Sequence, residues 1–189
     1  LNYVLKSLSP LKPDLSVVVV GFQSESVKGV FSDRGLVFVE QKEQLGTGHA
    51  AQQTKHALRD FSGDVLVVCG DMPFIKSRTL IDLVNRHQEK EACCTVLTLK
   101  TSEKKDFGRI IRNGMGAVVK IVEHNDTSAD EKKVDEFNSG VYCFDKGLFC
   151  KALGSIRDNN IQKEYYLTDI IEYIVKTGFT VETLQTWDA

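Results

Sequence analysis

Residues 64–73 read DVLVVCGDMP, and this stretch decides the class of fold that we expect. The run VLVVC is apolar, uninterrupted and rich in β-branched side chains, which is typical of a strand covered on both faces. Gly70 and Pro73 are turn residues, so we expect the strand to span residues 64–69. Asp71 then lies just beyond the strand end, where its carboxylate is available for chemistry.

The rest of the N-terminal half alternates strands with helices. Apolar β-branched runs predict further strands at residues 16–21 (SVVVVG) and 36–39. Helical spacing of apolar residues predicts helices at residues 1–11, 25–31, 46–58 and 80–87. This order predicts a doubly wound α/β fold with a mostly parallel central sheet, in which ligands bind beyond the carboxyl ends of the strands.

The C-terminal half has shorter strands separated by polar turns. We expect these strands at residues 93–99, 108–111, 117–123 and 140–144. A final amphipathic helix at residues 166–176 and a strand at residues 180–184 follow. The pattern indicates a smaller antiparallel or mixed portion beside the parallel half.

Composition narrows the classes of protein and partner. A chain of 189 residues with 42% hydrophobic content fits one domain, and 24 basic against 26 acidic residues give no field that would attract nucleic acid or an anionic membrane. Five cysteines without metal-type spacing are expected to be reduced, and no apolar run is long enough for a bilayer. We therefore expect a cytoplasmic protein that holds any phosphate at a local site.

A glycine-containing turn at residues 41–50, QKEQLGTGHA, is the first candidate site. Backbone amides at a helix start can bind an anion or the edge of a base, and small residues let a ligand approach the main chain. The alternative is a plain connection between a strand and a helix, in which His49 is structural.

Three other groups of polar residues are candidates. Asp71 can act as a hard oxygen ligand for Mg²⁺, or can cap the turn before the next helix. Residues 108–109 (GR), 123–124 (EH) and 138–140 (NSG) lie at predicted strand edges, where they can bind sugar hydroxyls or be solvated. Residues 164–170 (EYYLTDI) begin the last helix, and we favour a structural role for Thr168, Asp169 and the tyrosines.

Taken together, these motifs resemble one known family. Their order along the chain is QxEQLGTGHA, VCGDMP, DFGRI, IVEHxD, NSGVY and EYYLTDI. The chain is similar over its whole length to the uridyltransferase domain of bacterial bifunctional N-acetylglucosamine-1-phosphate uridyltransferase/glucosamine-1-phosphate acetyltransferase. The resemblance implies a Rossmann-like nucleotide-diphospho-sugar transferase fold, with a nucleotide-binding half at residues 1–90 and a sugar-binding half at residues 91–189.

The resemblance also implies roles for individual residues. Gln41, Gly46 and Thr47 match positions that hold the uracil and the nearby nucleotide. Cys69, where some relatives have tyrosine, and Gly70 match positions that line the strand end, and Asp71 matches the catalytic Mg²⁺ ligand. Gly108, Glu123 and Asn138 match positions that contact N-acetylglucosamine.

The reaction implied is attack of N-acetylglucosamine 1-phosphate on UTP with Mg²⁺, giving UDP-N-acetylglucosamine and pyrophosphate. The family's glycine-rich phosphate loop, second metal-ligand motif and β-helix, through which relatives form homotrimers, do not occur in this sequence. We therefore expect little turnover from this chain alone. The alternatives are a nucleotidyltransferase for another sugar or nucleotide, and a non-catalytic module that binds sugar nucleotides.

Overall fold

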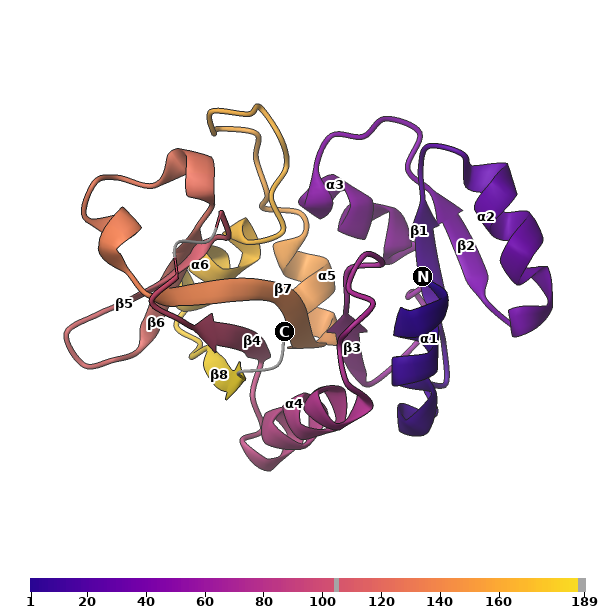
Figure 1. Ribbon diagram of the computed structural model, residues 1–189, viewed down its shortest axis with the longest axis horizontal. Coiled ribbons are helices and arrows are strands. Elements are labelled where there is room, and N and C mark those ends of the chain that lie inside the picture. Colours follow the sequence, from indigo (N-terminus) through magenta and orange to yellow (C-terminus); the bar gives the residue numbers. More distant parts are fainter. Residues whose placement is uncertain (104–105, 187–189) are drawn as a thin grey trace.

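The computed structural model describes residues 1–103 and 106–186, and its elements are labelled in Figure 1. The α-helices are α1 (Asn2–Leu8), α2 (Ser24–Phe31), α3 (Thr47–Gln52), α4 (Ser77–Glu89), α5 (Lys146–Ala152) and α6 (Asp169–Lys176). The strands are β1 (Val17–Val20), β2 (Val37–Glu40), β3 (Asp64–Val67), β4 (Cys94–Lys100), β5 (Arg109–Arg112), β6 (Val118–Val122), β7 (Glu136–Asp145) and β8 (Glu182–Thr186). Short 3₁₀ turns extend several of these helices and loops.

Strand β7 is the centre of a six-stranded sheet. The order is β6-β5-β7-β4-β8, and β3 also pairs with β7. The ten residues of β7 let it pair with three strands, β3, β4 and β5, all of them antiparallel. A separate two-stranded sheet is formed by β1 and β2, which run parallel.

The expectation of a mostly parallel central sheet is wrong for the described residues. Only the β1–β2 and β4–β8 pairs are parallel, whereas β3–β7, β4–β7, β5–β6 and β5–β7 are antiparallel. The error has a physical cause: an apolar run such as VLVVC shows that both faces of a strand are covered, but it carries no information about the direction of the neighbouring strands.

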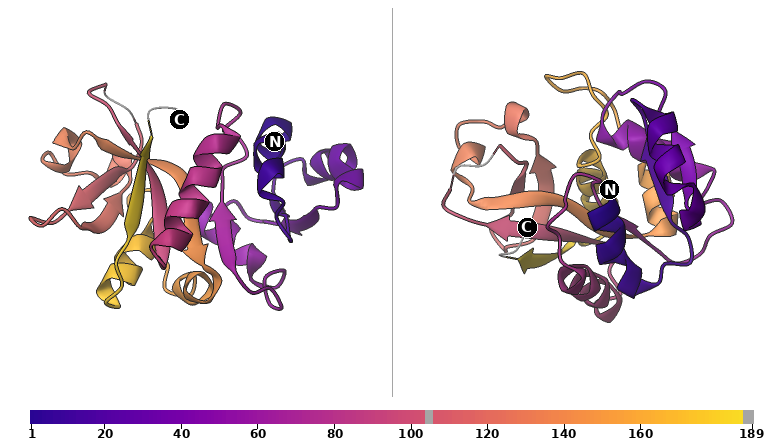
Figure 2. Two further views of the ribbon diagram at one scale, coloured as in Figure 1. Left: turned by 90° about the horizontal axis from the view of Figure 1, so that it is seen from below. Right: turned by 45° about the vertical axis from the view of Figure 1, so that its right-hand side comes forward.

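Helices cover both faces of the large sheet (Figures 1 and 2). On one face, Leu80 and Leu83 of α4 pack with Leu97, Val141 and Cys143. On the other face, residues of α5 and α6 pack with Tyr142 and Phe144 of β7. Because side chains alternate along a strand, β7 contributes its odd-numbered residues 141 and 143 to one core and its even-numbered residues 142 and 144 to the other.

Most of the predicted elements are present, with shifted ends. Strand β3 ends at Val67 rather than at Cys69, so Cys69 and Gly70 belong to the following turn. The predicted helix at residues 46–58 is α3 followed by a 3₁₀ turn, Gln53–Lys55. Helix α5 was not predicted, although Asp145 caps it by accepting a hydrogen bond from the amide of Leu148 at 2.7 Å.

Neither a disulfide nor a membrane span occurs in the part of the chain that is described. All five cysteines are free thiols; Cys94 and Cys143 are buried, whereas Cys69 is exposed. No helix of the described residues is long and apolar enough to cross a bilayer.

We expect Leu83→Ala to lower the free energy of unfolding by about 3 kcal/mol, because Leu83 is fully buried between α4 and the sheet and its truncation leaves a cavity. Val30→Ala is the matched control, since Val30 is 75% exposed and should change stability by less than about 0.5 kcal/mol. Urea denaturation followed by circular dichroism measures both, and equal effects would contradict the described core.

Candidate active site

A bulge in β7 shapes one side of the candidate site. The register between β4 and β7 shifts between Val96 and Thr98, opposite the NSG motif. Gly140 has φ 81° there, a left-handed conformation that glycine adopts without strain. The Gly140 amide donates to Asn138 Oδ1 at 3.1 Å, and Ser139 Oγ donates to the carbonyl of Leu97 at 2.8 Å. The sequence NSG therefore satisfies the polar groups that the bulge removes from the ladder.

Three predicted sugar-binding residues meet beside this bulge. The backbone amide of Asn138 donates a hydrogen bond to the backbone carbonyl of Gly108 at 2.8 Å. A Cβ atom built on Gly108 would lie 3.2 Å from Ile121 Cγ2 and 3.4 Å from Glu123 Oε2, so the Glu123 carboxylate lies beside the main chain of Gly108. Gly108, Glu123 and Asn138 thus form one corner, as a shared binding role requires, and we call it the sugar corner after the role that the sequence predicts for them.

Hydrogen bonds orient the side chains of this corner. Asn138 Nδ2 donates to the hydroxyl of Tyr142 at 2.7 Å. Thr168 Oγ1 donates to Glu123 Oε1 at 3.0 Å, and although Thr168 directly precedes α6, its side chain makes no capping hydrogen bond there. Sequence reasoning missed Tyr142, although N-S-G-V-Y places it four residues after Asn138, and it named Thr168 only in a group for which a structural role was favoured.

The environment of Glu123 is acidic. Burial raises the pKa of Glu123, the hydrogen bond from Thr168 lowers it, and the negative charges of Asp126 and Glu164 raise it again. Burial and the charge of Glu123 also raise the pKa of the Tyr142 hydroxyl well above its usual range. The corner therefore offers one carboxylate acceptor, Glu123, beside neutral hydroxyl and amide groups that are hydrogen-bonded to one another.

The turn after β3 lies next to the same corner. Cys69, Gly70 and Asp71 are all exposed there, and Cys69 Sγ donates to the carbonyl of Gly140 at 3.8 Å. Although Cys69 as a whole is exposed, desolvation of its thiol by the surrounding atoms, followed by the negative charges of Asp71 and Glu123, raises the pKa of the thiol. Asp71 and Glu123 are thus both close enough to Cys69 for their charges to act on it.

The Asp71 carboxylate fits one mode of magnesium binding. No cluster of three or more His, Cys, Asp or Glu side chains occurs among the described residues. Mg²⁺ is nevertheless commonly held by one or two carboxylates together with substrate phosphates and waters, and Asp71 is an exposed hard oxygen ligand of this kind.

Hydrogen bonds hold the predicted nucleotide-binding turn in place. Gln41 Nε2 donates to the carbonyl of Gly46 at 3.0 Å and lies 3.1 Å from His49 Nδ1. Gly46 precedes α3 with φ 106°, which favours glycine. Thr47 Oγ1 accepts a hydrogen bond from the amide of Leu167 at 3.0 Å. Gln41, Gly46 and Thr47 therefore belong to one unit, which we call the LGTG turn (residues 45–48, with Gln41 beneath it).

Residues 164–168 join the LGTG turn to the sugar corner. The amide of Tyr165 donates to the carbonyl of Leu45 at 2.8 Å, and the amide of Gly48 donates to the carbonyl of Tyr165 at 2.6 Å. The same segment carries Thr168, which binds Glu123. Asp71 is connected to the LGTG turn only indirectly, through Cys69, Glu123 and this segment.

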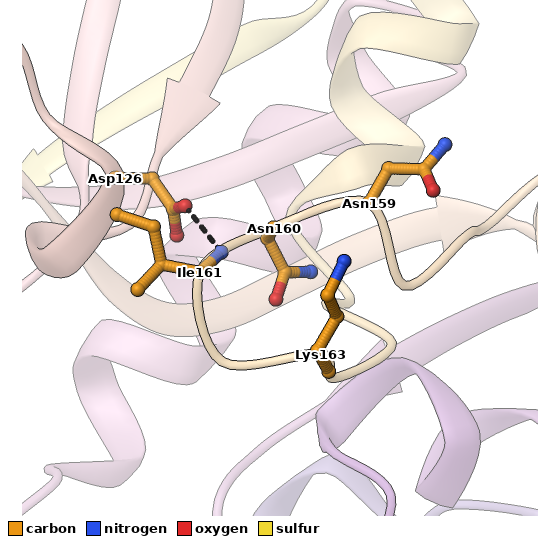
Figure 3. Close-up of a pocket in the computed structure, with 5 residues that line it drawn as sticks. All are labelled: Asp126, Asn159, Asn160, Ile161 and Lys163. Atoms are coloured by element: carbon orange, nitrogen blue, oxygen red, sulfur yellow. Dashed lines mark hydrogen bonds between the residues drawn. The ribbon is translucent and has the colours of Figure 1, made fainter.

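Two hollows lie along the acidic side of this region. One of about 490 Å³ is lined by Asp126, Asn159, Asn160, Ile161 and Lys163 (Figure 3). Its wall is tied together because the amide of Ile161 donates to Asp126 Oδ1 at 3.0 Å. A second hollow of about 210 Å³ includes Glu123, Thr168 and Asp169 in its lining. The sugar corner therefore opens into a recess with several carboxylates.

The chain matches the family model described as "Nucleotidyl transferase" over residues 2–187. The chain belongs to the nucleotidyl transferase family.

The curated relatives with high identity are bacterial proteins named "Bifunctional protein GlmU". The relative from Geotalea daltonii is 45% identical over 159 residues, which is 84% of this chain and 35% of that protein. The relative from Acetivibrio thermocellus is 40% identical over 188 residues, covering 100% of this chain and 41% of that protein. The chain thus spans about two fifths of the length of these relatives, and the resemblance expected from the motifs is confirmed at the level of homology.

Solved structures share the α/β fold of this nucleotidyl transferase. A UDP-glucose pyrophosphorylase complexed with UDP-glucose superposes with a TM-score of 0.71 at 15% identity, covering 97% of this chain and 77% of that chain. The inositol-1-phosphate CTP transferase from T. maritima gives a TM-score of 0.68 at 20% identity, covering 97% and 71%. At these identities the likeness concerns the fold alone.

We expect Gly48→Ala to lower the free energy of unfolding by roughly 2 kcal/mol, because a Cβ there would lie 2.8 Å from the carbonyl oxygen of Tyr165 and 2.9 Å from Ile156 Cδ1. Gly29→Ala in α2 is the control: a Cβ there meets nothing within 4 Å, so the substitution should stabilise by up to about 1 kcal/mol. Chemical denaturation tests both. A neutral Gly48→Ala would show that segment 164–168 does not press against α3.

We expect Asp169→Asn to remove a pH-dependent destabilisation. Burial, followed by the charges of Glu172, Glu123 and Asp126, raises the pKa of Asp169 from 3.8 to about 6. Because the folded pKa is raised, Asp169 destabilises the fold progressively as the pH rises from about 4 through about 6.

The variant should therefore match the parent near pH 4 and exceed its stability at pH 7.5 by roughly 1 kcal/mol, less than the full shift because the carboxyl is partly solvated. Urea midpoints at the two pH values measure this. An equal difference at both would contradict the assignment to Asp169.

Proposed function

We propose that this nucleotidyl transferase moves the uridyl group of UTP to N-acetylglucosamine 1-phosphate, forming UDP-N-acetylglucosamine and pyrophosphate. The observation that carries the proposal is that residues 164–168 bind both the LGTG turn and Glu123 of the sugar corner. The LGTG turn and the sugar corner, which lie roughly 60 to 90 residues apart in the sequence, thus border one region. Homology to GlmU proteins at 40% and 45% identity supports the same reading.

In this proposal, Gln41, Gly46 and Thr47 hold the uridine within the nucleotide-binding half, residues 1–90. Gln41 is 9% exposed and its amide is fixed by hydrogen bonds, so it can read a base edge in one orientation. Gly46 contacts the nucleotide through its main chain. The position has no room for a side chain, because a Cβ there would lie 2.7 Å from the carbonyl oxygen of Tyr165.

Gly108, Glu123 and Asn138 hold the sugar within the sugar-binding half, residues 91–189. The Glu123 carboxylate accepts hydrogen bonds from sugar hydroxyls, and the Asn138 amide can pair with a polar substituent such as an acetamido group. A site whose groups are already oriented discriminates against a sugar that leaves them unpaired. Cys69 and Gly70 line the turn between the two halves.

The reaction needs positioning and charge neutralisation rather than a covalent intermediate. A phosphate oxygen of the sugar 1-phosphate forms a bond to the α-phosphorus of UTP, and the bond from that phosphorus to the bridging oxygen of the β-phosphate breaks. Bound Mg²⁺ would offset the charge on the phosphates. Asp71 would hold the metal through its exposed carboxylate, which is the catalytic role proposed for this residue.

Glu123→Gln should weaken binding of UDP-N-acetylglucosamine by roughly 10- to 100-fold, because it replaces a charged acceptor in the sugar corner. Binding of UMP should not change, since UMP lacks the sugar. Isothermal titration calorimetry measures both ligands. Glu89→Gln at the exposed end of α4 is the matched control and should leave both affinities as they are.

Two further measurements separate the competing functions. Release of pyrophosphate from UTP, N-acetylglucosamine 1-phosphate and Mg²⁺ shows transfer directly. Titrations with UDP-glucose and CDP-linked ligands compare substrates, and tighter binding of either than of UDP-N-acetylglucosamine would favour a transferase for another substrate. Binding of the sugar nucleotide without pyrophosphate release would be compatible with both the proposed transferase and a binding module, whereas no binding at all would favour a structural role.

A further inference from the structure

Arg109 is a buried arginine that the proposed reaction does not use. It is the first residue of β5 and is 4% exposed. Its guanidinium lies over the ring of Phe137, with 4.5 Å between Cζ and the ring centroid, and its Nη1 donates a hydrogen bond to the backbone carbonyl of Phe107. No carboxylate within residues 1–103 and 106–186 forms an ion pair with it.

Packing alone does not explain an arginine at this position. Its Nε atom is buried without a hydrogen-bond partner in the described part of the chain. An unpaired donor and an unpaired charge both cost stability when they are buried, whereas an apolar side chain of the same length would fill the space without that cost. The feature that only the arginine supplies is its hydrogen bond to Phe107.

Arg109 also lies at the joint between the two parts of the sugar corner. Gly108 and Glu123 flank the β5–β6 pair, whereas Asn138 belongs to β7. In the described structure, β5 meets β7 at a single register pair, Arg109 with Phe137. The stacking of the guanidinium on Phe137 therefore reinforces the one place where β5 is attached to β7.

The hydrogen bond to Phe107 sets the direction of the amide that follows. The carbonyl of Phe107 and the N–H of Gly108 belong to one peptide unit, and in a trans peptide they point in opposite directions. Arg109 holds the carbonyl on the side of the sheet where Phe137 lies, whereas the neighbouring side chain of Asn138 lies on the opposite side. The N–H of Gly108 then points toward the sugar corner, and no acceptor for it occurs among the described residues.

We propose that Arg109 is a positioning residue that holds the peptide between Phe107 and Gly108 with its N–H toward the bound sugar, where it donates to an oxygen of the sugar unit. The corner then presents a fixed donor at Gly108 beside the acceptor of Glu123. Without Arg109 the peptide can tilt, and the donor is no longer held in one direction. The proposal rests on the sugar-binding role proposed above for Gly108.

Arg109→Met and Arg109→Lys test the proposal as a matched pair, because both side chains are unbranched and of similar length, but only lysine can donate to Phe107. Arg109→Met should weaken binding of UDP-N-acetylglucosamine by about 3- to 10-fold, the effect of one neutral hydrogen bond. Arg109→Lys should recover most of that loss. Binding of UDP should stay unchanged in both variants, since UDP lacks the sugar, and titration calorimetry measures both ligands.

Arg86→Met separates this role from a general loss of stability. Arg86 joins α4 to β8 through an ion pair with Glu182 at 2.8 Å, and its Nε is also buried without a partner in the described chain. This variant should lower the urea midpoint and keep the parental ratio of the two affinities. A folded Arg109→Met variant that keeps this ratio would overturn the proposal, as would equal losses in the methionine and lysine variants. The sugar-binding role of the corner would then still stand.

A further measurement uses the unaltered chain and is independent of how well a variant folds. In NMR spectra of the glycine-labelled protein, the amide proton of Gly108 should move to lower field when UDP-N-acetylglucosamine binds, because it gains an acceptor. UDP should not move it. A Gly108 signal that stays in place when the sugar nucleotide binds would overturn the proposal. A chain that binds UDP-N-acetylglucosamine no more tightly than UDP would instead remove the proposed sugar-binding role, and this proposal with it.

Discussion

The hydrogen bonds of residues 164–168 are the interaction on which the candidate site depends. This segment binds the main chain at Leu45 and Gly48 on one side and the Glu123 carboxylate on the other. Two elements that are distant in sequence are therefore held at a set spacing by short, mostly backbone contacts. Because backbone groups cannot be exchanged by mutation, the sequence requirement falls on Gly46 and Gly48, the small residues that let the start of α3 approach residues 164–168.

Charge gives the region a second constraint. Burial is the main cause that raises the pKa of Glu123 and of Asp169, and neighbouring carboxylates raise both further: Asp126 and Glu164 act on Glu123, and Glu172, Glu123 and Asp126 act on Asp169. These carboxylates lower the stability of the fold and at the same time form a polar recess, a compromise that is common at functional sites. A cation or a hydroxyl-rich ligand relieves the repulsion, whereas an unaccompanied anion increases it. Metal and sugar nucleotide are thus expected to bind together rather than separately.

Local patterns in the sequence predicted most of the elements, but not the way they combine. The run VLVVC correctly indicated a strand, and Asp71 correctly lies just after it. Whether β3 runs parallel or antiparallel to its neighbour depends on β7, a partner nearly 80 residues away in the sequence, and no local pattern encodes that direction. The position of Thr168 beside Glu123 likewise depends on tertiary packing, so the sequence indicated only a structural role at the start of the last helix. The assignments of individual residues to uridine, sugar and metal stay predictions.

The division of the strands into two sheets has a consequence for cooperativity. Within the described residues, β1 pairs only with β2, and no strand ladder connects them to β7. Isolated two-stranded ladders are marginal in water, and contiguous units of a protein can open with different free energies. The β1–β2 unit can therefore exchange its amide protons without disturbing the large sheet. Gln41, whose amide donates to Val20 at the end of β1, would then lose its backbone anchor while the sugar corner stayed assembled.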